Sequence, residues 1–459
     1  MKITRGLLAS LLLSIVPTLL FAQNTLVPEG ETPYQASAFP DRILLLPTAS
    51  PATSQIINWR TRTSVDKALA EITEADASPG LHLTASRRSG TSRLLEAGNG
   101  AAHHHSVTFD GLTPDTLYAY RVRGDGTWSE WFQFRTAADD HRPHTAIYFG
   151  DAQNSVKSHF SRTIREAYSS APRAQVMVHA GDMVNLRSGK HDDEWGEWFD
   201  AGSWINSMVN NVFAVGNHEY LKQKTGPRSL SPHVPVQFAT PGNGPDPLKD
   251  TVYYTDYQGV RYIVLNSMEA LQNEELAKLQ ADWLAKVLEN NPARWTVVTQ
   301  HHPVFSVSRG RDNPPLRKHW MPVFEKYGVD LVLQGHDHAY GRGRNLATGS
   351  SGKPGSGGPM YVVSVAGPKM YRLTESAKQS MDRLAEDTQL FQLITFEADS
   401  IQYRAITANG ILYDAFDIVR QEDGSNEVIE RKPDSDTNLC SNPNPSRPTR
   451  CWDGTEFVE

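Results

Sequence analysis

Five short runs of side chains that commonly bind metals lie in the middle of the chain. They are Gly150-Asp151, Gly181-Asp182, Gly216-Asn217-His218-Glu219, His301-His302-Pro303 and Gly335-His336-Asp337-His338. Each run follows a hydrophobic stretch typical of a buried strand, at 146–149, 176–178, 212–215, 295–298 and 329–333. Side chains just beyond the carboxyl ends of successive strands can meet in one crevice of an open α/β sheet. The order of the runs therefore predicts an α/β domain with one shared metal site.

The residue types in these runs suit two divalent ions. Two carboxylates, one amide and three imidazoles are enough for two ions if one carboxylate bridges them. The six candidate ligands are Asp151, Asp182, Asn217, His301, His336 and His338. Two carboxylates and a hydroxide against two divalent ions leave about one net positive charge, which favours phosphate. One Gly-Asp or His-x-His run arises easily by chance, whereas five runs in this order form a specific signal.

The order of the runs resembles that of the calcineurin-like metallophosphoesterases. Together with the segment before it, the chain most resembles the purple acid phosphatase branch of that family, over roughly residues 35–420. The resemblance implies that one ion is held by Asp151, Asp182 and His338, and the other by Asp182, Asn217, His301 and His336. Asp182 would then bridge the two ions. The resemblance also implies that His218 lies outside the ligand set and faces the leaving group.

These residues predict a phosphatase that hydrolyses phosphomonoesters through a hydroxide shared by the two metals. His218 suits a general acid because an imidazole titrates near neutral pH, and a purely structural histidine is the alternative. Glu219 is expected to orient the His218 ring. A phosphodiesterase acting on nucleotides or lipid headgroups would use the same site. A non-catalytic binding protein is a third alternative, which the six ligand positions count against.

Five further residues are candidates for the site. Asn185 stands where purple acid phosphatases carry a tyrosine that binds ferric iron, and Gln153 stands where other metallophosphoesterases carry a histidine. Both amides are weak, neutral donors, so we expect two divalent ions (zinc, manganese or ferrous iron) and a weaker first metal site. His302, Arg309 and Arg311 are candidate substrate contacts, since guanidinium groups suit phosphate. Packing by His302 and surface ion pairs by the arginines are the alternatives.

The length of 459 residues suggests two domains. Residues 35–136 carry short β-rich runs with turn signals about every ten residues, which predicts an all-β sandwich. Within it, residues 112–122 resemble a motif of fibronectin type III-like domains. Residues 143–420 would form the metallophosphoesterase domain, an α/β four-layer sandwich in which two facing mixed sheets are flanked by helices. Residues 421–459 are polar and are expected to form a disordered or loosely docked tail.

Several helices, strands and loops can be predicted within these domains. The spacing of apolar residues predicts helices at 160–168, 276–288 and 316–327, the last ending at Gly328 despite Pro322. Alternating runs at 391–396, 402–407 and 415–418 are expected to complete a second sheet, and the Gly/Ser-rich stretch 349–359 a mobile loop. The three histidines at 103–105 are interpreted as a solvated strand edge, because alternate strand side chains face opposite sides.

The start of the chain resembles a targeting segment. Lys2 and Arg5 precede an apolar run at 7–21, which is short for a membrane span, and Ala22 offers a small-residue cleavage point. Residues 1–22 are therefore predicted to be a signal peptide, with an uncleaved anchor as the alternative. The mature protein is expected in the periplasm or secreted.

The two cysteines, Cys440 and Cys451, suit a local disulfide in an exported protein, with two free thiols as the alternative. The net charge of −7 and the absence of a long basic run argue against nucleic-acid binding. The expected partner is a small phosphoester substrate, and the sequence leaves the oligomeric state open.

Overall fold

The computed structural model describes residues 22–23, 25–185, 192–344, 358–445, 447–452 and 456–457. Residues 1–21 of the predicted signal peptide and residues 349–357 of the Gly/Ser-rich stretch lie outside these ranges. Among the described residues, no helix is both long enough and apolar enough to cross a membrane.

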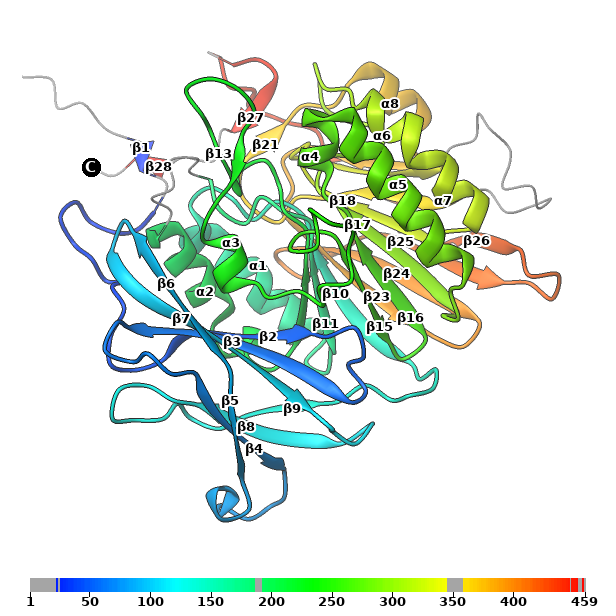
Figure 1. The fold of residues 1–459 in the computed structure, drawn as a ribbon. Helices are drawn as coiled ribbons and strands as arrows, with labels where there is room; N and C mark the ends of the chain where they lie inside the picture. Colours follow the sequence, from blue (N-terminus) through cyan, green and yellow to red (C-terminus); the bar gives the residue numbers. More distant parts are fainter. Residues whose placement is uncertain are drawn as a thin grey trace, which may run out of the picture.

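The first part of the chain forms the expected β-sandwich. Its two four-stranded sheets have the orders β2-β3-β7-β6 and β5-β4-β8-β9 (Figure 1). The strands are β2 Asp41–Pro47, β3 Ser54–Arg62, β4 Leu69–Glu74, β5 Ser86–Ser89, β6 Thr91–Ala97, β7 Gly100–Asp110, β8 Leu117–Val122 and β9 Phe132–Arg135, with a 3-10 turn at Leu81–Leu83. Trp59, Phe109 and Tyr120 fill the space between the sheets.

The interpretation of residues 103–105 as a solvated strand edge is wrong. These histidines lie inside β7, which is paired with β3 on one side and β6 on the other, so the strand is central. His104 and His105 are buried, and the His105 ring stacks on Trp59 with 5.0 Å between ring centroids. A hydrogen bond of 2.7 Å joins His105 Nε2 to the Thr61 hydroxyl, so the imidazole is a satisfied core group.

The second part contains two seven-stranded sheets that face each other. The first has the order β12-β11-β10-β23-β24-β25-β26 and the second β15-β16-β17-β18-β20-β19-β22. The first sheet consists of β10 His144–Phe149, β11 Val176–His179, β12 Asn210–Phe213, β23 Leu390–Phe396, β24 Ser400–Thr407, β25 Leu412–Arg420 and β26 Asn426–Glu430. The second consists of β15 Tyr253–Tyr257, β16 Val260–Val264, β17 Trp295–Gln300, β18 Leu331–Gln334, β19 Tyr340–Arg344, β20 Met360–Val363 and β22 Arg383–Ala385.

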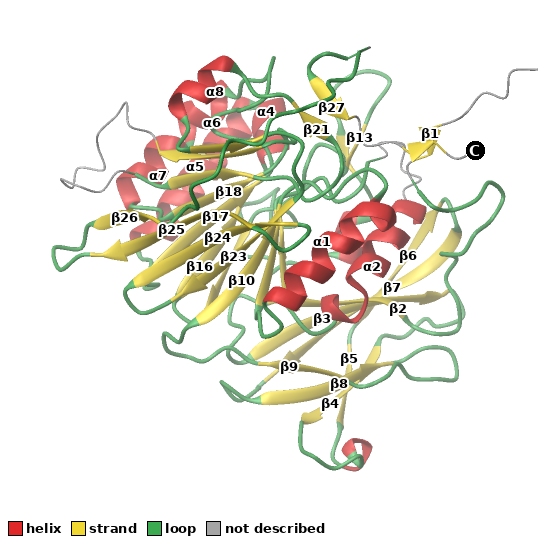
Figure 2. Cartoon of the chain, turned by 180° about the vertical axis from the view of Figure 1, so that it is seen from behind, coloured by secondary structure: helices red, strands yellow, loops and turns green. Residues whose placement is uncertain are grey.

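Helices cover the outer faces of both sheets, which completes the predicted four layers (Figure 2). Helices α1 (Val156–Ser170) and α2 (Asp192–Asn206) pack on the first sheet through Phe160, Trp195 and Trp198. The second sheet is covered by α4 Ser267–Gln272, α5 Glu274–Glu289, α6 Pro314–His319 and α7 Met321–Tyr327. The smaller elements are α3 Val234–Gln237, α8 Glu375–Ser380, β1 Ala22–Gln23, β13 Tyr220–Leu221, β14 Ser229–Leu230, β21 Met370–Tyr371, β27 Arg450–Trp452 and β28 Glu456–Phe457.

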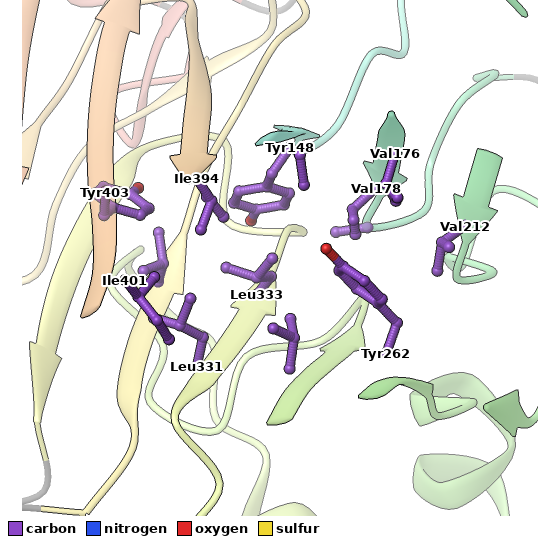
Figure 3. Close-up of a cluster of buried hydrophobic side chains, with 14 of the residues drawn as sticks. Tyr148, Val176, Val178, Val212, Tyr262, Leu331, Leu333, Ile394, Ile401 and Tyr403 are labelled. Carbon is purple, nitrogen blue, oxygen red and sulfur yellow. The ribbon is translucent and has the colours of Figure 1, made fainter. Parts of the chain in front are cut away.

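The inner faces of the two sheets bury one continuous apolar core. Tyr148 and Ile394 of the first sheet point toward Leu333 and Tyr262 of the second, and all four are fully buried or nearly so (Figure 3). A fully buried leucine or isoleucine of this core contributes roughly 1.5–3 kcal/mol by leaving water. This core holds the carboxyl ends of the parallel strands in a fixed arrangement.

Three expectations about local elements need correction. The predicted helix at 316–327 is two helices, α6 and α7, because Pro322 has no backbone N–H and occupies the first turn of α7. The last strands do not complete the second sheet but join the first, where β23 pairs antiparallel with β10. The first sheet also continues past residue 420, since β26 pairs with β25. The segment after 420 is therefore partly ordered.

Candidate metal centre

The five runs converge because their strands are parallel neighbours within each sheet. In the first sheet β10 pairs parallel with β11, and β11 with β12; in the second, β17 pairs parallel with β18. Residues that follow these strands lie at the same edge. The structure groups the ligand atoms of Asp151, Asp182 and His301 within 4.8 Å of one another, and does the same for His301, His302 and His336.

Asp182 lies at the centre of the cluster. Its Oδ2 is 3.1 Å from His301 Nε2 and accepts a hydrogen bond of 3.0 Å from Gln153 Nε2. Its Oδ1 accepts a hydrogen bond of 2.7 Å from the backbone N–H of His218. The carboxylate is almost completely buried. This position between His301 and Gln153 suits a carboxylate that is shared by two ions.

The remaining ligand positions surround Asp182 on both sides. Asp151 Oδ2 accepts a 2.6 Å hydrogen bond from the backbone N–H of His336, and Asp151 Oδ1 lies 3.8 Å from His301 Nδ1. The side chains of His301 and His336 approach with 3.1 Å between Nε2 and Nδ1. On the other side, His338 Nε2 is 3.0 Å from Gln153 Nε2. Gln153 therefore belongs to the cluster by position.

The distances between the donor atoms, and the lack of hydrogen-bond partners at three of the described ones, are those expected of metal ligands. Two ligand atoms about 2.1 Å from one ion lie about 3 Å apart at neighbouring corners of an octahedral shell and about 3.4 Å apart in a tetrahedral one. A distance in this range separates His301 Nε2 from His336 Nδ1 and from Asp182 Oδ2. Within the ligand cluster, three buried atoms also have no hydrogen-bond partner among the described residues: Asp151 Oδ1, Gln153 Oε1 and His338 Nδ1. Buried polar atoms normally have partners, so these atoms are available to bind ions.

Glycines allow the ligand-bearing turns to approach one another. Gly181 has φ +86°, and a Cβ there would lie 2.6 Å from the backbone nitrogen of Gly216. A Cβ on Gly216 would collide with the Asp182 carboxylate. Only glycine combines the left-handed conformation with this close contact. The Gly-Asp and Gly-Asn-His patterns thus have a direct steric cause.

Three site residues adopt a left-handed backbone conformation although they carry side chains. The φ angles are +51° at Asp182, +73° at His336 and +50° at His338. Such conformations cost free energy and persist where the surrounding structure imposes them. Here they turn side chains from the ends of β11 and β18 into the crevice.

His218 is positioned by a backbone carbonyl rather than by the neighbouring carboxylate. Its Nδ1 donates a hydrogen bond to the carbonyl oxygen of Asn185, and its Nε2 lies 3.9 Å from Asp182 Oδ2. The expectation that Glu219 orients this ring is wrong. Both oxygens of Glu219 accept from backbone N–H groups: Oε2 from Asp182 and Gly216 at 2.8 and 2.7 Å, and Oε1 from Met183 at 2.9 Å. Glu219 therefore ties together the two turns that carry Asp182 and His218.

Burial and mutual charge shift the pKa values of the cluster. Burial raises the pKa of Asp151 to about 7. Burial opposes ionisation of Asp182, but His301 and His218 hold its pKa well below the usual range. Burial also opposes protonation of His301, yet Asp182 and Asp151 raise its pKa to about 9. Without metal ions, protons on Asp151 and His301 therefore offset part of the negative charge of the carboxylates. Metal binding must displace these protons.

The other predicted contacts fall into two groups. His302 lies within the cluster: its Nδ1 is 2.9 Å from the Ser267 hydroxyl, and its ring is 4.2 Å from that of His336. Arg311 also reaches the site, where its Nη1 donates to the carbonyl oxygen of His336. Arg309 instead lies at the surface, with its guanidinium 3.6 Å from Glu375. The two arginines are thus separated although they are two residues apart.

Asn217 and Asn185 lie on the turns around His218. Asn217 is buried, and its carbonyl oxygen accepts a 3.2 Å hydrogen bond from Arg228 Nη1. The Asn185 backbone forms two hydrogen bonds: its carbonyl oxygen accepts from His218, and its N–H donates to the Glu194 carboxylate. Asn185 remains a predicted ligand only. Its carbonyl has a role that the sequence did not indicate.

The sequence also missed Lys369 and Tyr371. Both follow β20, a strand parallel to β18, so the rule that located the other runs applies to this strand end as well. The run 364–371 contains no aspartate, asparagine or histidine, the residue types that mark the other strand ends. The Tyr371 ring lies 4.7 Å from the His338 ring, and burial lowers the pKa of Lys369 to about 8, with Asp182 and Asp151 opposing that shift.

Comparison with known proteins agrees with this geometry. A model of the calcineurin-like phosphoesterases matches residues 104–340, and a model of the purple acid phosphatase N-terminal domain matches residues 40–136. The chain belongs to the calcineurin-like phosphoesterase family. The resemblance seen in the sequence is therefore confirmed.

The relatives are distant. An uncharacterized protein of Mycobacterium tuberculosis is 25% identical, over 64% of this chain and 60% of its own length. Purple acid phosphatase 23 of Arabidopsis thaliana is 27% identical, over 54% of this chain and 59% of its own length. The Fe(3+)-Zn(2+) purple acid phosphatase 12 of Arabidopsis thaliana is 26% identical, over 56% of this chain and 55% of its own length. The matched region spans less than two thirds of each of these relatives.

Solved structures support the fold. The purple acid phosphatase PPD1 from yellow lupin seeds superposes with a TM-score of 0.69 at 16% identity, covering 84% of this chain and 75% of that chain. The structure of PhoD gives 0.61 at 12% identity, covering 88% of this chain and 94% of that chain. At such low identity, these structures speak for the architecture alone.

Proposed function

We propose that this protein is a dinuclear metal-dependent phosphatase that hydrolyses phosphomonoesters. The observation that carries the proposal is the buried cluster around Asp182, where carboxylate and imidazole donors lie about 3 Å apart at the ends of parallel strands. Membership of the phosphoesterase family supports the same reaction class. When bound, two divalent ions would polarise the phosphoryl oxygens and lower the pKa of an attacking water.

We propose that Asp182 bridges the two ions and that the other ligands are Asp151, Asn217, His301, His336 and His338. Gln153 is a further ligand in this proposal, because its Oε1 is buried without a partner and an amide oxygen can bind a divalent ion. The assignment of Asn185 rests on its place in the sequence alone. Zinc, manganese and ferrous iron suit this mixture of oxygen and imidazole nitrogen donors.

His218 is proposed to protonate the leaving group. Its Nδ1–H is fixed by the carbonyl of Asn185, so Nε2 is the atom that can hold the transferable proton. Nε2 lies near Asp182 and therefore near the position of the reacting phosphoryl group. A general acid at this point would neutralise the alkoxide as the ester bond breaks.

The experiment that tests the proposal combines metal analysis with substrate comparison. Purified protein should contain about two metal equivalents and hydrolyse 4-nitrophenyl phosphate faster than bis(4-nitrophenyl) phosphate. The Asp182→Ala variant should lose more than one metal equivalent and all turnover, because its carboxylate is shared. A folded Asp182→Ala protein with near-normal metal content and rate would exclude this centre as the catalytic site. A faster rate on the diester would favour the phosphodiesterase alternative.

We also propose that the protein is exported after removal of residues 1–22. The charged start and the apolar run at 7–21 support this, and so does the disulfide between Cys440 and Cys451. N-terminal sequencing of the protein recovered from periplasm or medium is the test. A chain that still begins at Met1 there would contradict the cleavage.

A further inference from the structure

Three cationic side chains surround one aromatic ring beside the metal centre. The guanidinium carbons of Arg311 and Arg450 each lie 4.8 Å from the centroid of the Tyr371 ring, and Lys369 Nζ lies 5.7 Å from it. The ring itself is 4.7 Å from that of His338, a proposed metal ligand. Positive charge from three separate segments therefore meets at the rim of the centre.

Two of these cations have no counter-charge in direct contact within the part of the chain that the structure describes. Among the described residues, neither Lys369 nor Arg450 forms an ion pair or a side-chain hydrogen bond, although Lys369 is only 8% exposed. Arg311 differs, because its Nη1 lies 3.3 Å from Asp337 Oδ1 and donates to the carbonyl of His336. Burying an ammonium group without a partner is costly, so an anion at this point would be strongly favoured.

The carboxylates near Lys369 belong to the metal centre. Asp182 and Asp151 are close enough to favour its charged form. In the proposed enzyme these two carboxylates hold divalent ions, so their negative charge is already neutralised. The cations around Tyr371 then add to the positive field of the ions and do not cancel it.

The C-terminal segment delivers Arg450 to this place. Strand β27 pairs antiparallel with β21, which sets Arg450 opposite Tyr371. The next residue, Cys451, is disulfide-bonded to Cys440 and packs with Val365 and Met370. The backbone N–H of Cys440 donates a 2.9 Å hydrogen bond to Glu386. The disulfide therefore ties the segment that carries Arg450 to the body of the domain.

We propose that Lys369, Arg311 and Arg450 form an anion subsite next to the metal centre. It binds a second anionic group of the substrate, a phosphate or a carboxylate, carried on the leaving-group side of the scissile ester. Lys369 and Arg450 contact that anion, and Arg311 holds the ring of Tyr371 between them. The inference rests on the proposed phosphatase function and gives a lower KM to substrates that carry a second anionic group.

The test compares three aryl esters on the metal-loaded enzyme: phenyl phosphate, 3-carboxyphenyl phosphate and 1,3-phenylene bisphosphate. A charge-assisted contact of ordinary strength should lower KM by about tenfold for an ester with a second anion, with little change in kcat. A gain with both charged esters means that the subsite accepts any anion, and a gain with the bisphosphate alone means that it selects phosphate. Equal KM values for all three esters in the wild type would overturn the inference.

Variants link the effect to these residues. Arg450→Gln should remove most of the KM advantage of the charged esters, and Arg450→Lys should restore part of it. Arg447→Gln is the matched control, because it removes the same charge from an exposed position on the same segment. A KM advantage that survives in Arg450→Gln and in Lys369→Met would place the anion elsewhere and refute the subsite.

A binding measurement separates this inference from the proposed reaction. Calorimetry with propane-1,3-bisphosphonate and propylphosphonate needs no turnover. If none of the esters is hydrolysed, the phosphatase proposal fails, and tighter binding of the bisphosphonate that is lost in Arg450→Gln would still support the subsite. Equal affinity for the two phosphonates in the wild type would refute the subsite even if hydrolysis is observed.

Discussion

His218 lies beside the proposed metal centre but is not one of its proposed ligands. Its ring is held by the carbonyl of Asn185, and its removal leaves the ligand side chains in place. We therefore expect His218→Ala to retain both metals, as measured by elemental analysis, while hydrolysis of alkyl phosphates slows by about 10²–10⁴. The loss should shrink for 4-nitrophenyl phosphate, whose leaving group needs no proton. A uniform loss across leaving groups, or a loss of metal, would contradict the general-acid role.

The visible absorption spectrum of the protein tests which ions the centre holds. Asn185 stands where a tyrosine would favour ferric iron, so the protein with its native metals should show no tyrosinate-to-iron band in the visible spectrum. Asn185→Tyr should raise ferric affinity if the ring is accommodated. Tyr371 is the relevant control, because its ring lies 4.7 Å from that of His338. A purple wild type that loses its band in Tyr371→Phe would show that this tyrosine, and not residue 185, reaches the metal.

At the scale of elements, Glu219 connects two turns that come from different strands. Its carboxylate accepts hydrogen bonds from three buried backbone N–H groups, those of Asp182, Met183 and Gly216. Leaving these groups unsatisfied costs about 1–3 kcal/mol each. We expect Glu219→Ala to lower the free energy of unfolding by about 3 kcal/mol or more in urea titrations, and to weaken metal retention. The matched control is Glu375→Ala on exposed α8, for which the same assay should show little change.

The sequence indicated which strands exist better than how they pair. Residues 295–298 and 176–178 were predicted as strands and lie inside β17 and β11. A short apolar run that ends at a polar turn is typical of a buried strand. Pairing was harder, since β10 and β23 are joined by contacts between residues far apart in sequence. No local pattern encodes such a partner.

The candidate site shows the same division. Residue types and spacing were sufficient to nominate Asp182 and His301, which lie 3.1 Å apart in the structure. The roles of Glu219 and of the Asn185 carbonyl depend on backbone groups, which are identical at every residue and leave no signature in the sequence. Lys369 was missed because a single lysine after a strand looks like any surface lysine.

For the molecule as a whole, buried neutral histidines couple stability to pH. His144 lies between the two sheets, with its Nε2 2.8 Å from the Tyr262 hydroxyl, and burial lowers its pKa to about 3. The unfolded chain protonates this imidazole near pH 6.5, so below that pH the unfolded state binds more protons and stability falls. His144 alone should cost about 2 kcal/mol between pH 7 and pH 5.

Thermal unfolding across this pH range tests the coupling. The melting temperature of the wild type should fall between pH 7 and pH 5, and His144→Asn should flatten that dependence even if it lowers stability at pH 7. His82→Asn is the control, since His82 is exposed on the sandwich. An unchanged pH dependence in His144→Asn would mean that other groups dominate acid unfolding.

The pairing of β10 with β23 has a consequence for how the protein is made. Thr145 and Thr395 hydroxyls lie 3.0 Å apart across this pair, although 250 residues separate them in sequence. Every proposed ligand, from Asp151 to His338, leaves the ribosome before β23 exists. Until then the strand that precedes Asp151 lacks one neighbour, and the spacing of its carboxylate from the other donors is not fixed. An ion captured by the nascent chain would meet ligands whose spacing is not yet fixed, so we expect the choice among metals to follow translation of the last strands.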